Sequence, residues 1–203
     1  MTSMQIKSDL TPLTVDLSSL MPQARMTEEQ FYAFCQSNRD LRIERAATGE
    51  VIVMTPALSD KGNRNLKIAQ QVANWSDQDG TGEVFDSSSG FTLPNGATRS
   101  PDVAWVTLER WRALSQAQQA SFAPICPNFV VELRSASDAL KTLQEKMEEY
   151  IENGAELGLL IDRKNRKVYI YRLGYSPEVL PYPESVSCDP ELPGCSLHMA
   201  KIW

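Results

Sequence analysis

Apolar residues recur with the period of an α-helix in three segments of the chain. These predicted helices span residues 28–38, 63–75 and 138–153. The first has Thr27 as its N-cap and Gln30 three positions later, a pairing that satisfies free N–H groups at a helix start. The third is expected to be capped by Ser137 or Asp138 and to end at Asn153-Gly154, where glycine supplies a left-handed residue.

Short apolar runs bounded by turn residues predict strands around these helices. They lie at 41–43, 51–54, 83–85, 91–93, 102–106, 129–133, 157–162, 167–172 and 196–203. Two hairpins are expected, one around Thr48-Gly49 and one around Lys164-Asn165. This order of elements predicts an α/β fold with a mixed β-sheet core flanked by helices. Residues 1–25 are expected to form an irregular arm, and residues 26–203 a single domain.

The composition limits the compartment and the kind of metal site. Hydrophobic residues make up 42% of the 203 residues and charged residues 23%, as in soluble globular proteins. No apolar run approaches the roughly 20 residues that span a bilayer, and no signal peptide is evident, so we expect a cytoplasmic protein without membrane contact. Four scattered cysteines and one histidine, His198, do not form a zinc pattern. Any bound metal should therefore use oxygen ligands.

The net charge of −6 is unevenly distributed along the chain. The first 30 and the last 30 residues account for five of the six excess negative charges, which leaves residues 31–173 close to neutral. This middle region is not a strongly basic surface of the kind that coats DNA. A nuclease that carries its own acidic metal site can show such a balance.

Two acids enter segments that otherwise have the character of buried strands. Asp102 follows Pro101 at the start of one strand, and Glu132 lies near the end of the apolar strand 129–133. The strand period of two places Glu132 on the face opposite Phe129. A buried ionised acid needs a counter-charge, and a divalent ion is one of the few groups adequate for two acids together.

The helix that follows Glu132 carries two lysines with different orientations. At roughly 100° per residue, Lys146 falls about 40° outside the apolar stripe and Lys141 about 80° outside it. Lys146 is therefore predicted to lean inward toward the strand ends, and Lys141 to face solvent.

These segments together resemble a known family. SPDVAW at 100–105, FVVELRSASD at 129–138 and KTLQEKMEEYIENGAELGLLID at 141–162 are similar to the bacterial restriction endonuclease domain family of the Uma2 type, within the PD-(D/E)XK nuclease superfamily. The resemblance runs from about Met26 to Trp203 and includes GEVIVMTP at 49–56. It implies a restriction-endonuclease-like fold with added β-hairpins and a metal-dependent endonuclease acting on DNA. Duplex-cutting relatives often act as dimers, which leaves a homodimer open.

The resemblance also assigns roles to residues. It implies that Asp102, Glu132 and the backbone carbonyl of Leu133 bind Mg²⁺ or Mn²⁺, and that a lysine orients or activates the attacking water. The superfamily usually places this lysine two residues after the glutamate, where this chain has Arg134. Arginine keeps the charge but is a poor general base.

In related nucleases the lysine has moved to the next helix, which makes Lys146 the candidate here. A second acid often comes from an early helix. Glu44, just before the Thr48-Gly49 turn, is carried over for that role, and the helix at Asn63 offers only Asn63 and Asn65 as polar candidates.

Each of these residues also has a simpler interpretation. Asp102 could cap backbone N–H groups at a strand start, and Arg134 alone or another base could neutralise Glu132 without any metal. Lys146 could be solvated with its stem packed, and the basic residues 163–167 could form a solvated turn. Because two close carboxylates repel each other without metal, Asp102→Asn is expected to abolish metal-dependent cleavage and to leave folding intact or slightly improved. A large drop in melting temperature would point to Asp102 as a structural cap instead.

Two functions follow from these alternatives. The first is hydrolysis of phosphodiester bonds in DNA with a bound divalent metal. The second is a catalytically inactive nuclease scaffold that binds nucleic acid or a partner protein. Titration with Mn²⁺ separates the two, because a retained acid pair binds metal and a degenerate site does not.

Overall fold

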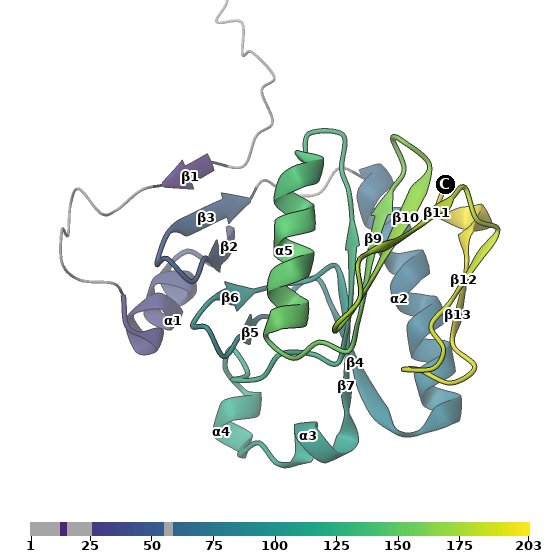
Figure 1. The fold of residues 1–203 in the computed structure, drawn as a ribbon. Helices are drawn as coiled ribbons and strands as arrows, with labels where there is room; N and C mark the ends of the chain where they lie inside the picture. The colour runs from purple at the N-terminus through teal and green to yellow at the C-terminus, as the bar shows by residue number, and fades with distance from the viewer. Residues whose placement is uncertain (1–12, 16–25, 55–58) are drawn as a thin grey trace, which may run out of the picture.

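The computed structural model describes residues 13–15, 26–54 and 59–203, and its centre is a six-stranded sheet (Figure 1). The strand order is β11-β10-β9-β8-β7-β4, and the parallel pair β8–β9 among antiparallel neighbours makes the sheet mixed, as predicted. The strands are β4 (Gly82–Asp86), β7 (Val103–Thr107), β8 (Phe129–Leu133), β9 (Leu157–Asp162), β10 (Lys167–Arg172) and β11 (Glu178–Pro181).

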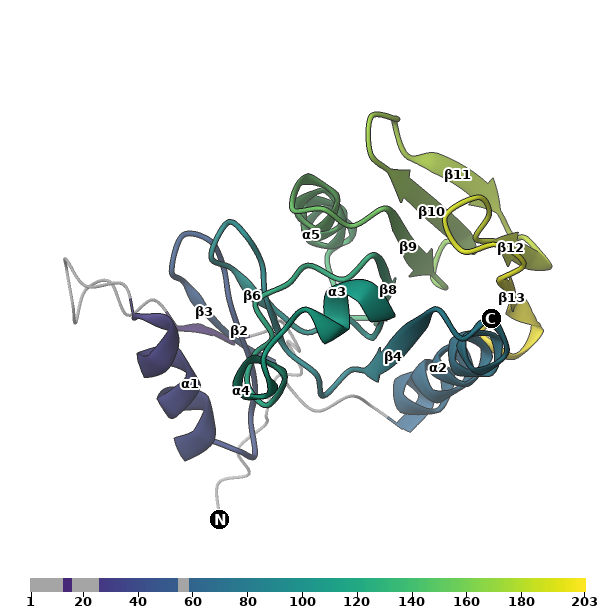
Figure 2. The same cartoon turned by 90° about the horizontal axis from the view of Figure 1, so that it is seen from below.

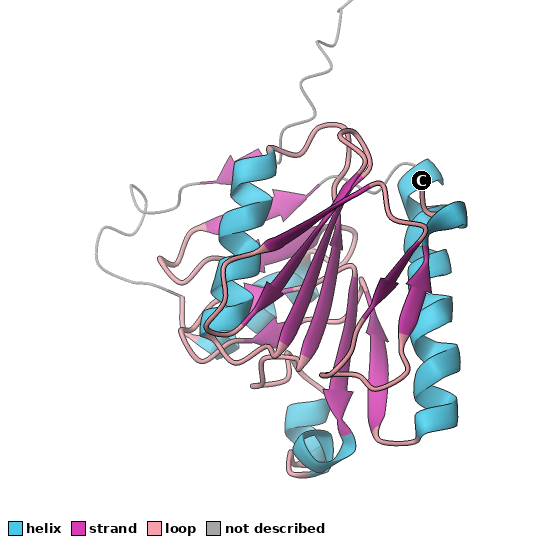
Figure 3. Cartoon of the chain, turned by 45° about the vertical axis from the view of Figure 1, so that its right-hand side comes forward, coloured by secondary structure: helices cyan, strands magenta, loops and turns pink. Residues whose placement is uncertain are grey.

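A long helix covers each face of this sheet (Figure 3). Helix α2 (Ser59–Asp79) contributes Ile68 and Val72 to the core on one face, together with Phe129 and Val131 of β8. Helix α5 (Leu140–Glu152) connects β8 to β9 and packs on the other face, where Met147, Tyr150 and Val130 share a second core. The alternation along β8 therefore separates the two cores, as the strand period predicts.

A second sheet lies beside the first and carries helix α1 (Figure 2). Its order is β1-β3-β2-β6-β5, and all of its strand pairs are antiparallel. Thr27 and Gln30 form the predicted capping box at the start of α1, whose Phe31 is buried with Ile43 and Val51. The elements are α1 (Glu28–Ser37), β1 (Leu13–Val15), β2 (Arg42–Arg45), β3 (Val51–Met54), β5 (Phe91–Thr92) and β6 (Thr98–Arg99).

The C-terminal residues return to cover helix α2. Cys188, Cys195 and Leu197 are buried in the same core as Ile68, and the four cysteines are free thiols. Among the described residues, no helix combines the length and the apolarity that crossing a membrane requires. The remaining elements are α3 (Leu108–Arg112), α4 (Gln116–Gln119), β12 (Ser185–Ser187), β13 (Ser196–His198) and the 3₁₀-helix η1 (Met199–Lys201).

Several boundaries differ from the sequence prediction. Helix α5 is not capped by Ser137 or Asp138: its N-cap is Ala139, which makes no side-chain cap. The Asp138 carboxylate instead accepts the backbone N–H of Ser135 at 2.8 Å, so a local turn uses the oxygen that would have capped the helix. The predicted arm at 1–25 lies outside the described residues, apart from β1.

Other elements also begin or end away from their predicted bounds, helix α2 and the strands β7 and β13 among them. Helix α2 begins at Ser59, four residues before the predicted start. The prediction missed this first turn because it is polar and lacks the apolar period of the rest of the helix. The strand expected at 102–106 begins at Val103. The strand expected at 196–203 ends at His198, where a 3₁₀ turn follows.

Candidate active site

The two acids predicted to form a site lie opposite each other at the ends of neighbouring strands. Strands β7 and β8 pair antiparallel with Val103 opposite Val131, so one further step places Asp102 opposite Glu132. Asp102 is 1% exposed and Glu132 is 4% exposed. Each carboxylate therefore depends on protein partners in place of water.

Within the described part of the chain, Asp102 has four partners. Its Oδ2 accepts the backbone N–H of Leu133 at 2.9 Å and lies 3.0 Å from Lys61 Nζ. Its Oδ1 accepts Asn65 Nδ2 at 2.9 Å and lies 3.6 Å from an Arg42 guanidinium nitrogen. Asp102 therefore accepts a backbone N–H, as the simpler interpretation of this residue expects. The same carboxylate is also contacted by an ammonium, a guanidinium and a side-chain amide.

Glu132 is held by two residues of α5. Its Oε1 accepts Tyr150 OH at 3.2 Å and lies 2.8 Å from Lys146 Nζ. The same ammonium lies 2.9 Å from Glu44 Oε1, so Lys146 bridges two buried carboxylates. The inward direction predicted for Lys146 is confirmed, and only 11% of its side chain is exposed.

The other two basic candidates lie elsewhere. Lys141 is exposed and pairs with Glu145 on the surface of α5. Arg134 donates to Asp162 Oδ2 at 2.9 Å and to the backbone carbonyl of Asp138 at 3.0 Å. The counter-charge of Glu132 therefore comes from α5 and not from the residue two positions along its own strand.

Glu44 belongs to the same network, although the sequence offered little support for it. It lies on β2, where its carboxylate accepts the backbone N–H of Ser100 at 3.0 Å and contacts Arg99 at 3.3 Å. Arg99 in turn donates to Glu149 of α5 at 2.6 Å. The small sheet thus contributes an acid and a base to the site formed on the large sheet.

Four partners were missed by the sequence reasoning: Arg42, Lys61, Arg99 and Tyr150. One signal for Arg42 was available, because Arg42 and Glu44 are two residues apart on one strand and so project to the same face. Nothing local marks Lys61, which lies in the polar first turn of α2.

Burial and the neighbouring charges shift the pKa values of the central groups. Burial raises the pKa of Glu132; Lys146 opposes this effect, while Asp102 and Glu44 reinforce it. Burial also acts to raise the pKa of Glu44, but Lys146 and Arg99 outweigh it and the pKa is lowered. For Lys146, burial lowers the pKa, and the two glutamates more than reverse this, so it remains an ammonium.

Comparison with known proteins gives this arrangement a family. The sequence model of a family described as "Putative restriction endonuclease", Uma2, matches residues 28–200. The chain belongs to the Uma2 family. A search of functionally curated proteins finds no match.

A solved structure resembles this Uma2 chain over most of its length. It is a crystal structure of a "putative nuclease belonging to DUF820" from Anabaena variabilis ATCC 29413, with a TM-score of 0.68. The two chains are 16% identical, and the match covers 87% of this chain and 97% of the other. At this identity the likeness shows the fold alone, and it confirms the restriction-endonuclease-like fold.

The oxygen atoms near Asp102 in this Uma2 chain are of the types that bind a hard divalent cation. Asn65 Oδ1 is buried and has no hydrogen-bond partner among the described residues, although its Nδ2 donates to Asp102. Arg134 N–H donates to the carbonyl of Ile161, which turns the N–H and C=O of Leu133 to the other edge of β8, toward Asp102. Carboxylate, amide and backbone oxygens are the ligands that Mg²⁺ and Mn²⁺ prefer.

The negative charges of Asp102 and Glu132 are already balanced by positively charged side chains of the protein. Within 26–54 and 59–203, no three His, Cys, Asp or Glu side chains are grouped as a metal-binding set. A cation at Asp102 would therefore draw on the amide and backbone oxygens and would compete with the ammonium groups that contact the acids.

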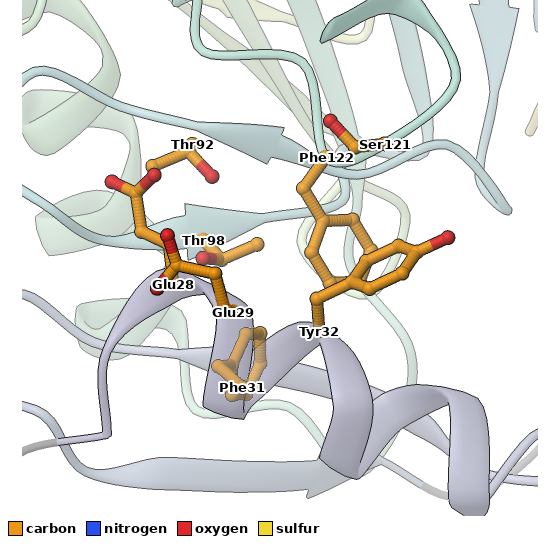
Figure 4. Close-up of a pocket in the computed structure, with 8 residues that line it drawn as sticks. All are labelled: Glu28, Glu29, Phe31, Tyr32, Thr92, Thr98, Ser121 and Phe122. Atoms are coloured by element: carbon orange, nitrogen blue, oxygen red, sulfur yellow. The ribbon is translucent and has the colours of Figure 1, made fainter. Parts of the chain in front are cut away.

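A separate pocket of about 270 Å³ lies against α1, away from these acids (Figure 4). Thr98 Oγ1 is buried there without a partner among the described residues. The pocket is lined by Glu28, Glu29, Phe31, Tyr32, Thr92, Thr98, Ser121 and Phe122. None of the residues that contact Asp102 or Glu132 lines it.

Proposed function

We propose that this protein is a metal-dependent endonuclease that hydrolyses phosphodiester bonds in DNA. Family and fold point to a nuclease; DNA as the substrate and Mg²⁺ or Mn²⁺ as the cofactor are part of the proposal. The observation that carries it is the Lys146 ammonium, held 2.8 Å from Glu132 and 2.9 Å from Glu44 at the strand end where Asp102 is buried. In metal-assisted phosphate hydrolysis, carboxylates hold the metal ion, and a positive side chain fixed beside them stabilises the charge that develops on the phosphate.

Each residue has a distinct task in this proposal. Asp102, Glu132 and the Leu133 carbonyl would hold the cation, which when bound polarises the phosphate and lowers the pKa of its water. Asp102 is oriented by the backbone N–H of Leu133, and Glu132 by Tyr150 OH. Lys146 stabilises negative charge as an ammonium. Arg134 has a supporting role, because its guanidinium is bonded to Asp162.

A basic turn beside the site supports a polyanionic substrate. The turn between β9 and β10 contains Lys164 and Arg166, and Lys167 begins β10; all three side chains are exposed. Arg163 in the same turn contacts Asp60 at 2.6 Å, which fixes the turn beside the first turn of α2. Positive side chains at this edge provide contacts for the phosphates of a nucleic acid. The turn is also well solvated, as the simpler interpretation expects.

The test is cleavage of supercoiled plasmid DNA with Mg²⁺, with Mn²⁺ and with EDTA. We expect nicking or linearisation only with a divalent cation, and a rate at least about a hundredfold lower for Asp102→Asn, Glu132→Gln and Lys146→Met. Lys141→Met is the matched control, since it removes the same charge from the exposed side of the same helix. Cleavage by the Asp102 variant at the parent rate would refute the proposal.

A catalytically inactive scaffold that binds nucleic acid or a partner protein is the second candidate. It is favoured by the contacts of Asp102, Glu132 and Glu44, each of which already has a protein cation as partner. Calorimetric titration with Mn²⁺ separates the two. Heat of binding that is lost in Asp102→Asn supports the enzyme, and no binding in either protein supports the scaffold.

A further inference from the structure

Among the described residues, three positively charged side chains contact Asp102 or Glu132: Lys61, Arg42 and Lys146. They differ in how many other contacts hold them in place. Lys146 contacts Glu132 and Glu44 at once and lies over the Tyr150 ring, 5.8 Å from its centre. A side chain with three partners loses all of them if it leaves. Lys146 is therefore a fixed part of the site.

Arg42 is also held in place. Its guanidinium donates to the backbone carbonyl of Ser100 at 2.6 Å, while its contact with Asp102 is longer, at 3.6 Å. A change at the Asp102 carboxylate thus leaves the main hydrogen bond of Arg42 intact.

Lys61 has no second contact of the kind that holds Lys146 or Arg42 in place. Within the described part of the chain its ammonium contacts Asp102 alone, at 3.0 Å, and 19% of its side chain is exposed. A lysine side chain has rotatable bonds along its whole stem. Lys61 can leave Asp102 for water without breaking any other described contact.

We infer that Lys61 is a displaceable counter-ion of Asp102. It neutralises the buried carboxylate while no divalent cation is bound, and it gives up this contact when the cation binds to the same oxygens. The inference rests on the proposed function, because it takes Asp102 as a ligand of the cation. Lys61 thereby makes the metal-free protein more stable and lowers its affinity for metal.

The higher stability of the metal-free protein and its lower metal affinity have the same cause. The contact between Lys61 and Asp102 exists only in the metal-free state, so it must be broken when the metal binds, and its free energy is subtracted from that of binding. Lys61→Met should therefore lower the melting temperature in EDTA and tighten Mn²⁺ binding at least tenfold, about 1.4 kcal/mol. Lys61→Gln should fall between the parent and Lys61→Met, since its amide still donates to Asp102 without the full charge. If Lys61 instead held Asp102 in the position that binds metal, Lys61→Met would bind Mn²⁺ more weakly than the parent.

The experiment is calorimetric titration of the full chain with Mn²⁺, together with thermal melts with and without Mn²⁺. Lys67→Met is the matched control: it removes the same charge from the same helix, where the Lys67 ammonium contacts only Gln70 Oε1, at 3.2 Å, within the described residues. We expect Mn²⁺ to raise the melting temperature of Lys61→Met more than that of the parent and of Lys67→Met.

Two failures would differ visibly. If the parent binds Mn²⁺ and Lys61→Met binds it equally or more weakly, the displaceable role is overturned while the proposed function survives. If neither protein binds more Mn²⁺ than Asp102→Asn does, the metal site itself is refuted, and the inference falls with it. A gain shared equally by Lys67→Met would also overturn it, because the cause would then be overall charge.

Discussion

Lys146→Met is the most informative single change in this protein. Methionine preserves most of the length and apolar character of the lysine stem, so packing beside Tyr150 is largely retained. The ammonium that lies 2.8 Å from Glu132 and 2.9 Å from Glu44 is removed. Two buried carboxylates are then left without the cation that they share.

The expected cost follows from this loss. Removing one partner of a buried ion pair typically costs about 3–5 kcal/mol. Tyr150 still donates to Glu132 and Arg99 still contacts Glu44, so we expect the lower end, about 3 kcal/mol at neutral pH. For a chain of this size, that corresponds to a melting temperature lower by roughly 6–12 °C.

The deficit should depend on pH with a definite sign. Without Lys146, the folded-state pKa values of Glu132 and Glu44 rise, which costs stability above the unfolded carboxyl pKa of about 4.3. The parent contribution of Lys146, whose pKa is raised, is fully present throughout the neutral range. Glu44 has a lowered pKa in the parent, so its contribution is lost in acid. The difference between the two proteins is therefore largest near pH 8 and shrinks as the pH falls toward 4.5.

The assay is urea denaturation followed by tryptophan fluorescence at pH 5 and at pH 8, in EDTA. Lys141→Met serves as the control and should stay within about 0.5 kcal/mol of the parent at both values, because its ion pair is exposed. A deficit under about 1 kcal/mol at pH 8 would refute the bridging role of Lys146. A deficit equal at pH 5 and pH 8 would show that lost packing, and not unpaired charge, is its cause.

Three further changes test other parts of the structure. Asp102→Asn should lower stability by about 2–4 kcal/mol in thermal melts with EDTA, because Lys61 and Arg42 lose a buried anion; an unchanged or higher melting temperature would restore the expectation drawn from two repelling acids. Gly82→Ala should cost about 1–3 kcal/mol in urea denaturation, since the added Cβ would overlap the Trp105 ring, and a neutral result would show that the ring moves. Thr98→Val should stabilise by about 1 kcal/mol by removing a buried hydroxyl without a partner among the described residues; a lower melting temperature would reveal a partner for it.

Local periodicity accounts for the parts of the site that were predicted. The apolar run 129–133 became β8 with the same bounds, and its alternation placed Glu132 on the face covered by α5. The helical phase of α5 placed Lys146 inward and Lys141 outward. Both predictions depend only on the geometry of one element, which its own residues specify.

Competition between local and distant partners explains what was missed. Asp138 seemed suited to cap α5, but a nearer backbone N–H takes its carboxylate. Asn65 of α2 contacts Asp102 from 37 residues away, Lys61 contacts it from the same helix, and Arg42 contacts it from β2. No pattern within α2 or β2 indicates which acid these side chains meet.

The sequence by itself determined the α/β class, the mixed sheet and the acids and lysine at the strand ends, because hydrophobic periodicity acts over a few residues. Only the tertiary structure decided the partners of each charge: Lys146 for Glu132, Lys61 for Asp102 and Asp162 for Arg134. The physical reason is that a buried charge pairs with the opposite charge that packing brings within about 4 Å. That choice depends on how α2, α5 and the small sheet pack against β7 and β8, and no single segment encodes it.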